Sequence, residues 1–184
     1  MRQYISIARL RMTLILTVVA VVASLGAFVS HPKIEAAYDE TRDAFQKVLA
    51  VCEDRVSQGA NIRSLAFNHR AHFDAQAILA FDAAHDVAKK ARVYQNSTQH
   101  DVRQYWAEQY AYERAALWLI ESSTLPPSAE LGQTLLALKS ANKAVADARS
   151  HYNAKVKIYN EARSGLMATP VAYLTHYRAR PLLE

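Results

Sequence analysis

The strongest constraint on this chain is a run of 19 consecutive residues without a charged side chain, from Met12 to Ser30. As an α-helix this run would be about 28 Å long, close to the roughly 30 Å hydrocarbon core of a lipid bilayer. Arg9 and Arg11 precede the run, and Lys33 follows it. We therefore predict a transmembrane helix that contacts the lipid bilayer through residues 12–30. The anchor residues are Met12, Leu14, Ile15, Leu16, Val18, Val19, Val21, Val22, Leu25 and Phe28.

The same segment has a second interpretation, the signal peptide of a cleaved, secreted helical protein. Arg9 and Arg11 would form its basic start, and Ser24-Leu25-Gly26 offers small residues for cleavage. The apolar part of a signal peptide is usually about 7–15 residues long, so the length here favours a retained anchor. The basic start then predicts that residues 1–31 form a cytoplasmic tail and anchor, with residues 32–184 as a separate domain across the membrane.

The distribution of charge argues against a nucleic-acid partner. The formal net charge is +5, and residues 1–33 hold four basic residues and no acidic one. Residues 34–184 hold 18 basic and 17 acidic residues. Binding to nucleic acid needs a cluster of positive charge, which this nearly balanced part lacks.

The C-terminal part of the chain is locally basic. Residues 139–184 carry 8 basic and 3 acidic residues, and their end combines Arg178 and Arg180 with aromatic and aliphatic side chains. This combination suits a contact between the C-terminal tail and anionic lipid. The alternative is an ordinary packed segment with solvated charges.

The rest of the sequence predicts helices. Only 4 Gly and 5 Pro are present, which is few for a protein built from strands and turns. After residue 32, apolar residues recur with helical spacing in four segments. We expect these segments to begin at Pro32 and to continue over residues 61–94, 99–122 and from Ser128 onward. The predicted fold class is all-α, an N-terminal transmembrane helix followed by an antiparallel up-down four-helix bundle with long helices.

The fourth segment has the most regular pattern. Six apolar or aromatic residues follow one another at intervals of seven: Leu131, Leu138, Val145, Tyr152, Tyr159 and Leu166. A repeat of seven places side chains on one face of a helix, as in bundles and coiled coils. We expect the two tyrosine rings to stack along this face, with hydroxyls that reach backbone groups or asparagines.

This segment resembles the A-R-x-x-Y-N-x-x-V-x-x-Y-N stretch of LemA-family proteins. The matching residues are Ala148, Arg149, Tyr152, Asn153, Val156, Tyr159 and Asn160. The tail from His176 to Glu184 is similar to a weakened form of the family's basic-aromatic C-terminus, whereas Asp74-Ala75-Gln76-Ala77 departs from its I-P-N-L. The resemblance implies an N-terminal anchor, an antiparallel bundle and no defined reaction. It also implies the inner membrane of a bacterium, with the bundle on the periplasmic or extracellular side; one member lineage acts in magnetosome membranes.

A metal site is the main alternative to a purely structural second segment. His69 and His72 are three residues apart, which would place both imidazoles on one helical face, and Asp74 follows. The chain lacks HExxH and ExxH carboxylate pairs, and a further ligand from His85 would lie more than two turns away. We therefore predict no cofactor and no metal, and keep these three residues as the candidates for a metal-binding accessory factor.

Motifs for catalysis are absent from the sequence. Cys52 has no nucleophile motif beside it, no G-x-S-x-G occurs, and four glycines cannot form a phosphate-binding loop. We therefore expect a non-enzymatic, membrane-anchored scaffold or protein-interaction module whose protein partner the sequence does not identify.

Overall fold

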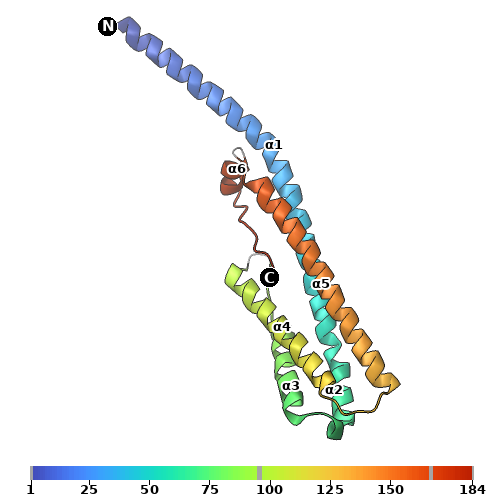
Figure 1. The fold of residues 1–184 in the computed structure, drawn as a ribbon. Helices are drawn as coiled ribbons and strands as arrows, with labels where there is room; N and C mark the ends of the chain where they lie inside the picture. Colours follow the sequence, from blue (N-terminus) through green and yellow to red (C-terminus); the bar gives the residue numbers. More distant parts are fainter. Residues whose placement is uncertain (1, 95–96, 166–167, 184) are drawn as a thin grey trace. The chain divides into compact units, whose positions relative to one another are not determined.

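The computed structural model describes the backbone of residues 2–94, 97–165 and 168–183, and within these ranges the side chains from residue 11 onward except those of Val19, Val22 and Ala23. Leu166, the last member of the predicted repeat of seven, lies outside the described residues. All regular structure in this part of the chain is helical, which confirms the all-α prediction. The elements, seen in Figure 1, are α1 (Arg2–Ser57), α2 (Gly59–Asn68), a 3₁₀ turn η1 (Arg70–His72), α3 (Ala75–Lys90), α4 (Gln99–Glu121), α5 (Ala129–Arg163) and α6 (Ala168–Leu174).

The first helix is longer than the sequence pattern suggested. We expected a new helix to begin at Pro32, but Pro32 lies inside α1, which is continuous from Arg2 to Ser57. A proline inside a helix leaves the carbonyl four residues earlier, here Phe28, without its usual donor. No helix is long and apolar enough to cross a membrane where side chains are described.

The predicted second segment is three elements instead of one. Helix α2 ends at Asn68, and the backbone of Phe73 is extended, with φ −116° and ψ 144°. Asp74 then caps a new helix, because its carboxylate accepts hydrogen bonds from the backbone N–H groups of Gln76 (2.7 Å) and Ala77 (2.9 Å). An aspartate that satisfies free N–H groups in this way favours a helix start, so the prediction of one helix over 61–94 was wrong.

Side-chain caps also fix the starts of α4 and α5. Thr98 and Asp101 form a capping box, in which each side chain bonds the other residue's backbone N–H. At α5 the hydroxyl of Ser128 accepts from the N–H of Leu131 at 3.2 Å. Helix α4 therefore begins at the predicted Gln99, and α5 begins one residue after Ser128, where the sequence predicted its start.

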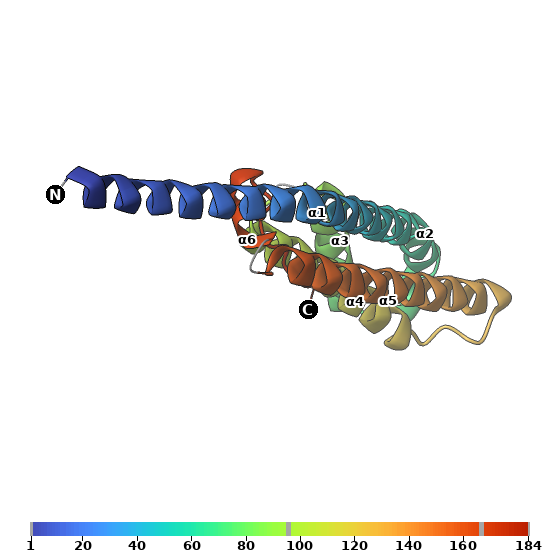
Figure 2. The same cartoon turned by 90° about the horizontal axis from the view of Figure 1, so that it is seen from above.

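The chain divides into two compact units, and α1 and α5 contribute to both. Unit 1 contains residues up to Thr41 together with Lys155–Arg180, and unit 2 contains Arg42–Ala154 and the residues after Arg180. In unit 1, α6 lies beside α1 in both views (Figures 1 and 2), and α1, α5 and α6 share a small core. Its buried residues are Ile34, Tyr159, Ala168, Val171 and Ala172.

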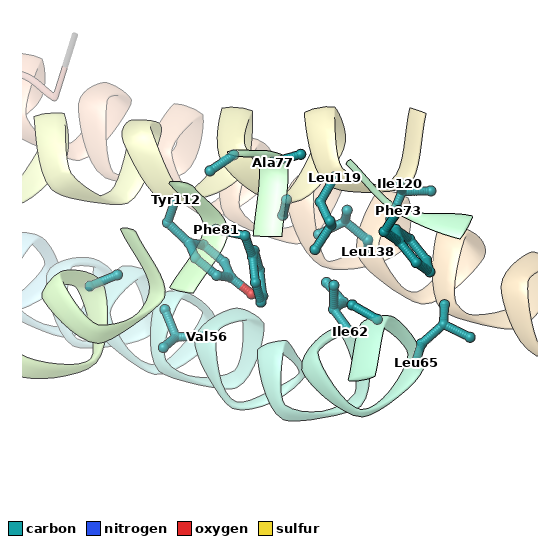
Figure 3. Close-up of a cluster of buried hydrophobic side chains, with 14 residues drawn as sticks. Val56, Ile62, Leu65, Phe73, Ala77, Phe81, Tyr112, Leu119, Ile120 and Leu138 are labelled. Carbon is teal, nitrogen blue, oxygen red and sulfur yellow. The ribbon is translucent and has the colours of Figure 1, made fainter. Parts of the chain in front are cut away.

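Unit 2 contains the larger core. Helices α3 and α4 run antiparallel and pack on each other (Figure 1). Side chains from both, together with some from α1, α2 and α5, form one buried cluster (Figure 3). Phe81, Tyr112 and Leu119 are among its fully buried members.

Gly59 permits a close approach within unit 2. A Cβ on Gly59 would overlap the imidazole of His85 and come within 2.9 Å of the Tyr112 hydroxyl. The absence of a side chain at this first residue of α2 therefore lets the α3 and α4 side chains reach the backbone of α1. There His85 Nε2 lies 3.1 Å from the Val56 carbonyl, and the Tyr112 hydroxyl donates to the Arg55 carbonyl at 3.2 Å.

Candidate functional site

The two Tyr-Asn pairs of α5 contact the backbone of the chain's own C-terminal segment. In unit 1 the Tyr159 hydroxyl donates to the Arg178 carbonyl at 2.7 Å. The Asn160 side chain bonds one residue twice, because its Nδ2 donates to the Arg180 carbonyl (3.0 Å) and its Oδ1 accepts from the Arg180 N–H (3.1 Å). Burial raises the pKa of Tyr159, which keeps this hydroxyl protonated and able to donate.

The second pair repeats these contacts in unit 2. The Tyr152 hydroxyl donates to the Pro181 carbonyl at 3.1 Å. Asn153 Nδ2 donates to the Leu183 carbonyl (2.9 Å), and Asn153 Oδ1 accepts from the Leu183 N–H (2.8 Å). Each pair therefore uses its tyrosine for one carbonyl and its asparagine for both backbone groups of a single residue.

Three side chains of this C-terminal segment are also held. In unit 1 the guanidinium of Arg180 lies over the Tyr38 ring, with its central carbon 4.8 Å from the ring centroid, a cation–π geometry. The ring of Tyr177 lies against the same Tyr38 at 5.2 Å between centroids. In unit 2 the side chain of Leu183 is only 3% exposed. Arg178, Ala179 and Leu182 are exposed.

Each tyrosine ring of the two pairs packs on an aromatic ring of α1. Tyr152 packs on Phe45 of α1 within unit 2, with centroids 5.5 Å apart. Tyr159 packs on Tyr38 of α1 within unit 1, at 5.9 Å. The expectation that the hydroxyls reach backbone groups agrees with the structure, but the sequence did not reveal which backbone.

The other residues of the family-like motif are structural in this arrangement. Ala148 and Val156 are buried on α5. Arg149 places its guanidinium over the Trp106 ring of α4, 5.5 Å from the centroid. Ala148 and Arg149 therefore support the packing of α5 in unit 2, and Val156 supports it in unit 1.

The predicted anchor residues lie on the first half of α1. Val19 and Val22 have side chains outside the described residues. The other eight are all more than half exposed, and none belongs to either core. Apolar side chains in this number normally have a packing partner or a lipid environment.

The metal candidates do not form a site. His69 is the residue that ends α2 and His72 belongs to η1, so the prediction that both face one side of a single helix was wrong. The Asp74 carboxylate is engaged as the cap of α3. Within the described ranges of the chain, no three His, Cys, Asp or Glu residues lie close enough together to hold a metal ion.

A buried arginine forms the polar centre of unit 2, and sequence analysis missed it. Arg55 is 1% exposed and pairs with Glu113 at 3.0 Å. Its other terminal nitrogen donates to the backbone carbonyl and to Oε1 of Gln109, both at 3.0 Å. These partners come from α4, so the cluster ties α1 to α4. Burial leaves the Nε of Arg55 without a hydrogen bond.

Three ionisable groups near Arg55, the Cys52 thiol and the Tyr105 and Tyr112 hydroxyls, are held in their protonated forms. Burial raises the pKa of the Cys52 thiol, although the nearby Arg55 opposes this effect. Burial also raises the pKa of Tyr105, and it raises that of Tyr112 to about 12. A protonated buried thiol is a poor nucleophile, because the thiolate is the reactive form. This cluster therefore stabilises the fold and does not resemble a catalytic centre.

A cavity of about 480 Å³ lies beside this cluster in unit 2. Its lining includes His85, Tyr105 and Gln109, and its charged residues are Glu53, Lys89 and Arg92. The charges are of mixed sign, so they favour neither a cationic nor an anionic ligand. The Tyr-Asn pairs, whose hydrogen bonds are matched to one specific backbone, are therefore the stronger candidate site.

Comparison of the chain with family models, curated proteins and solved structures gives no match.

Proposed function

We propose that this chain is a non-enzymatic, single-pass membrane protein that acts as an interaction module. The observation that carries the proposal is the contrast along α1. Residues 12–30 are uncharged, and the large apolar side chains described among them are more than half exposed. From Ile34 onward the same helix buries a face in the two cores. A helix that carries no charge over about 28 Å and then becomes amphipathic would suit passage from lipid into a folded domain.

The position of α6 supports a second contact with the membrane. In unit 1, α6 packs on α1 between Ala27 and Tyr38, where the uncharged run ends. Tyr173 is 82% exposed and Leu174 is 76% exposed on α6. Exposed aromatic and aliphatic side chains near the end of a transmembrane segment are typical of the interfacial region of a membrane protein. The proposed lipid contact of the C-terminal part is therefore α6, because Leu183 and the segment before it are engaged with α5.

The remaining features of the proposal follow from the predicted family type. Residues 32–184 would form a LemA-like domain with the up-down topology of a four-helix bundle, on the periplasmic or extracellular side of a bacterial inner membrane. The basic residues before the apolar run support this orientation. The partner is a protein, and the Tyr-Asn pairs are the best-defined binding feature of the chain.

Membrane fractionation tests the proposal. We expect the full chain to stay in the pellet after carbonate washing of membranes, because a transmembrane helix resists extraction. The double variant Leu16→Lys, Val21→Lys places two charges in the apolar run, each costing about 2.5–3.5 kcal/mol at the centre of a spanning helix, and should shift the chain to the soluble fraction.

The matched control is Phe67→Lys, which charges an exposed apolar residue of α2 in unit 2. It should leave the chain in the pellet. Recovery of the unaltered chain in the carbonate supernatant would refute the anchor. If the double variant is recovered in the pellet as completely as the unaltered chain, residues 12–30 are not what holds the protein in the membrane.

A further inference from the structure

One buried side chain in the lining of the unit 2 cavity has an unused hydrogen-bond donor. Gln109 of α4 lines this cavity and is 2% exposed. Its Oε1 and its backbone carbonyl both accept from Arg55 Nη2 at 3.0 Å. Because an arginine can only donate, the amide oxygen must be the atom that faces Arg55. The Nε2 of Gln109 is left without a hydrogen-bond partner in the described part of the chain.

This free amide group is reached from the cavity. Among the described residues, the enclosed polar atoms that lack a partner belong to Arg55, Gln58 and His85. The Nε2 of Gln109 also lacks a partner but is not one of these enclosed atoms, so it is accessible. Since the side chain is otherwise buried, the accessible space is the cavity that it lines. The cavity, hereafter the Gln109 cavity, therefore contacts a group with two N–H donors.

A second donor lies on the same side of α4. Tyr105 is four residues before Gln109, so the two side chains share one face of the helix, and Tyr105 also lines the cavity. Burial raises the pKa of the Tyr105 hydroxyl, which therefore stays protonated and able to donate. Its hydrogen-bond partner is the Cys52 thiol. A thiol is a weak hydrogen-bonding group, so an oxygen atom in the cavity would be a better acceptor.

The rest of the lining indicates the character of a suitable ligand. The charged residues Glu53, Lys89 and Arg92 are exposed, so charge lies on the solvent side. The buried guanidinium of Arg55 is already paired with Glu113, and a carboxylate in the cavity would therefore be buried without a counter-charge of its own. The volume of about 480 Å³ is typical of sites for small molecules. The apolar residues of the lining are Leu49, Val56, Ala60, Ala88, Ala91 and Val93.

We propose that the Gln109 cavity binds an uncharged, mainly apolar small molecule through a carbonyl oxygen, which accepts hydrogen bonds from Gln109 Nε2 and the Tyr105 hydroxyl. The apolar walls contact the body of the ligand. Because a buried donor without a partner is unfavourable, such a ligand is preferred over an apolar molecule of the same shape that has no oxygen. The site lies wholly in unit 2, and it goes beyond the proposed interaction function because it requires neither the anchor nor a protein partner.

Two aromatic probes of similar shape test the role of the oxygen. Benzophenone has a carbonyl group between two phenyl rings, and diphenylmethane has a methylene group in its place. The full chain in detergent is dialysed to equilibrium against each probe, with the same concentration of micelles on both sides. We expect saturable binding of benzophenone, and binding of diphenylmethane that is about tenfold weaker. Equal affinity for the two probes, or no saturable binding of benzophenone, would overturn the proposal.

Variants of the donors separate hydrogen bonding from the shape of the cavity. Gln109→Glu removes the donor but keeps an oxygen for Arg55, so it should bind benzophenone about tenfold more weakly and diphenylmethane as the unaltered chain does. Tyr105→Phe should act in the same direction. The matched control is Gln46→Glu, at an exposed position of α1 in unit 2, which should change the binding of neither probe. Undiminished benzophenone binding by Gln109→Glu would contradict the proposed contact.

A second measurement uses the unaltered chain and covers the case in which Gln109→Glu does not fold. Ultraviolet light causes the carbonyl carbon of bound benzophenone to bond to a nearby C–H group, and mass spectrometry locates the attachment. Crosslinks at Leu49, Val56 or Val93 that saturate with probe concentration support the proposal. Crosslinks found only outside the lining, or crosslinks that keep rising in proportion to the probe, overturn it. None of these results depends on the outcome of membrane fractionation.

Discussion

At the scale of single residues, Gly59 and Arg55 determine how α1 meets its neighbours in unit 2. Gly59 leaves space for the His85 ring and the Tyr112 hydroxyl, and Arg55 pairs with Glu113 in the buried polar cluster. Neither residue stands out in the sequence, because a glycine between helices first suggests only a helix end. Arg55 also lies between Cys52 and Val56 on a face whose other members are apolar. Their roles depend on partners that come from distant helices.

Two glycine-to-alanine variants should change stability in opposite directions. Gly59→Ala should lower the free energy of unfolding by about 1–3 kcal/mol, because the new methyl group overlaps His85. Gly132→Ala should raise it by up to about 1 kcal/mol, because this helical position of α5 has open space and alanine favours the helix. Urea unfolding of the detergent-solubilised protein measures both. A neutral Gly59→Ala would contradict the close packing described here.

At the scale of elements, the sequence predicted the helix starts that depend on neighbouring residues. Helix α4 begins at the predicted Gln99, and α5 begins one residue after the predicted Ser128. The continuous α1 was missed, because Pro32 was interpreted as the start of a new helix, whereas it lies inside α1. The break before α3 was also missed, since Asp74 was considered as a metal ligand and not as a cap. The partner of the Tyr-Asn pairs could not be predicted, because helical periodicity says nothing about an extended segment.

The role of Asp74 gives a prediction for α3. Asp74→Ala should lower the free energy of unfolding by about 0.5–2 kcal/mol, because the N–H groups of Gln76 and Ala77 lose their acceptor. Asp74→Asn should retain most of the stability, because an amide oxygen also caps. Added Zn²⁺ should leave the melting temperature of the unaltered protein unchanged. A large stabilisation by Zn²⁺ that disappears in Asp74→Ala would instead restore the metal-site hypothesis.

At the scale of the whole molecule, each unit has a distinct part in the proposed function. Unit 1 contains the uncharged run of α1 and the exposed Tyr173 and Leu174 of α6, which would meet the membrane. Unit 2 contains the larger core and the buried Arg55. Each unit holds one Tyr-Asn pair bonded to the C-terminal segment. Anchoring and binding therefore use different residues and are open to separate tests.

Cysteine accessibility tests the central claim, a single membrane pass, most directly. Single cysteines replace Gln3, Val18 or Phe67 in a Cys52→Ala background, and a membrane-impermeant maleimide is added to intact cells. The account predicts labelling at position 67 only, labelling at position 3 after the membrane is permeabilised, and protection at position 18 until detergent is added. Labelling at position 18 as fast as at position 67 in intact membranes would contradict it.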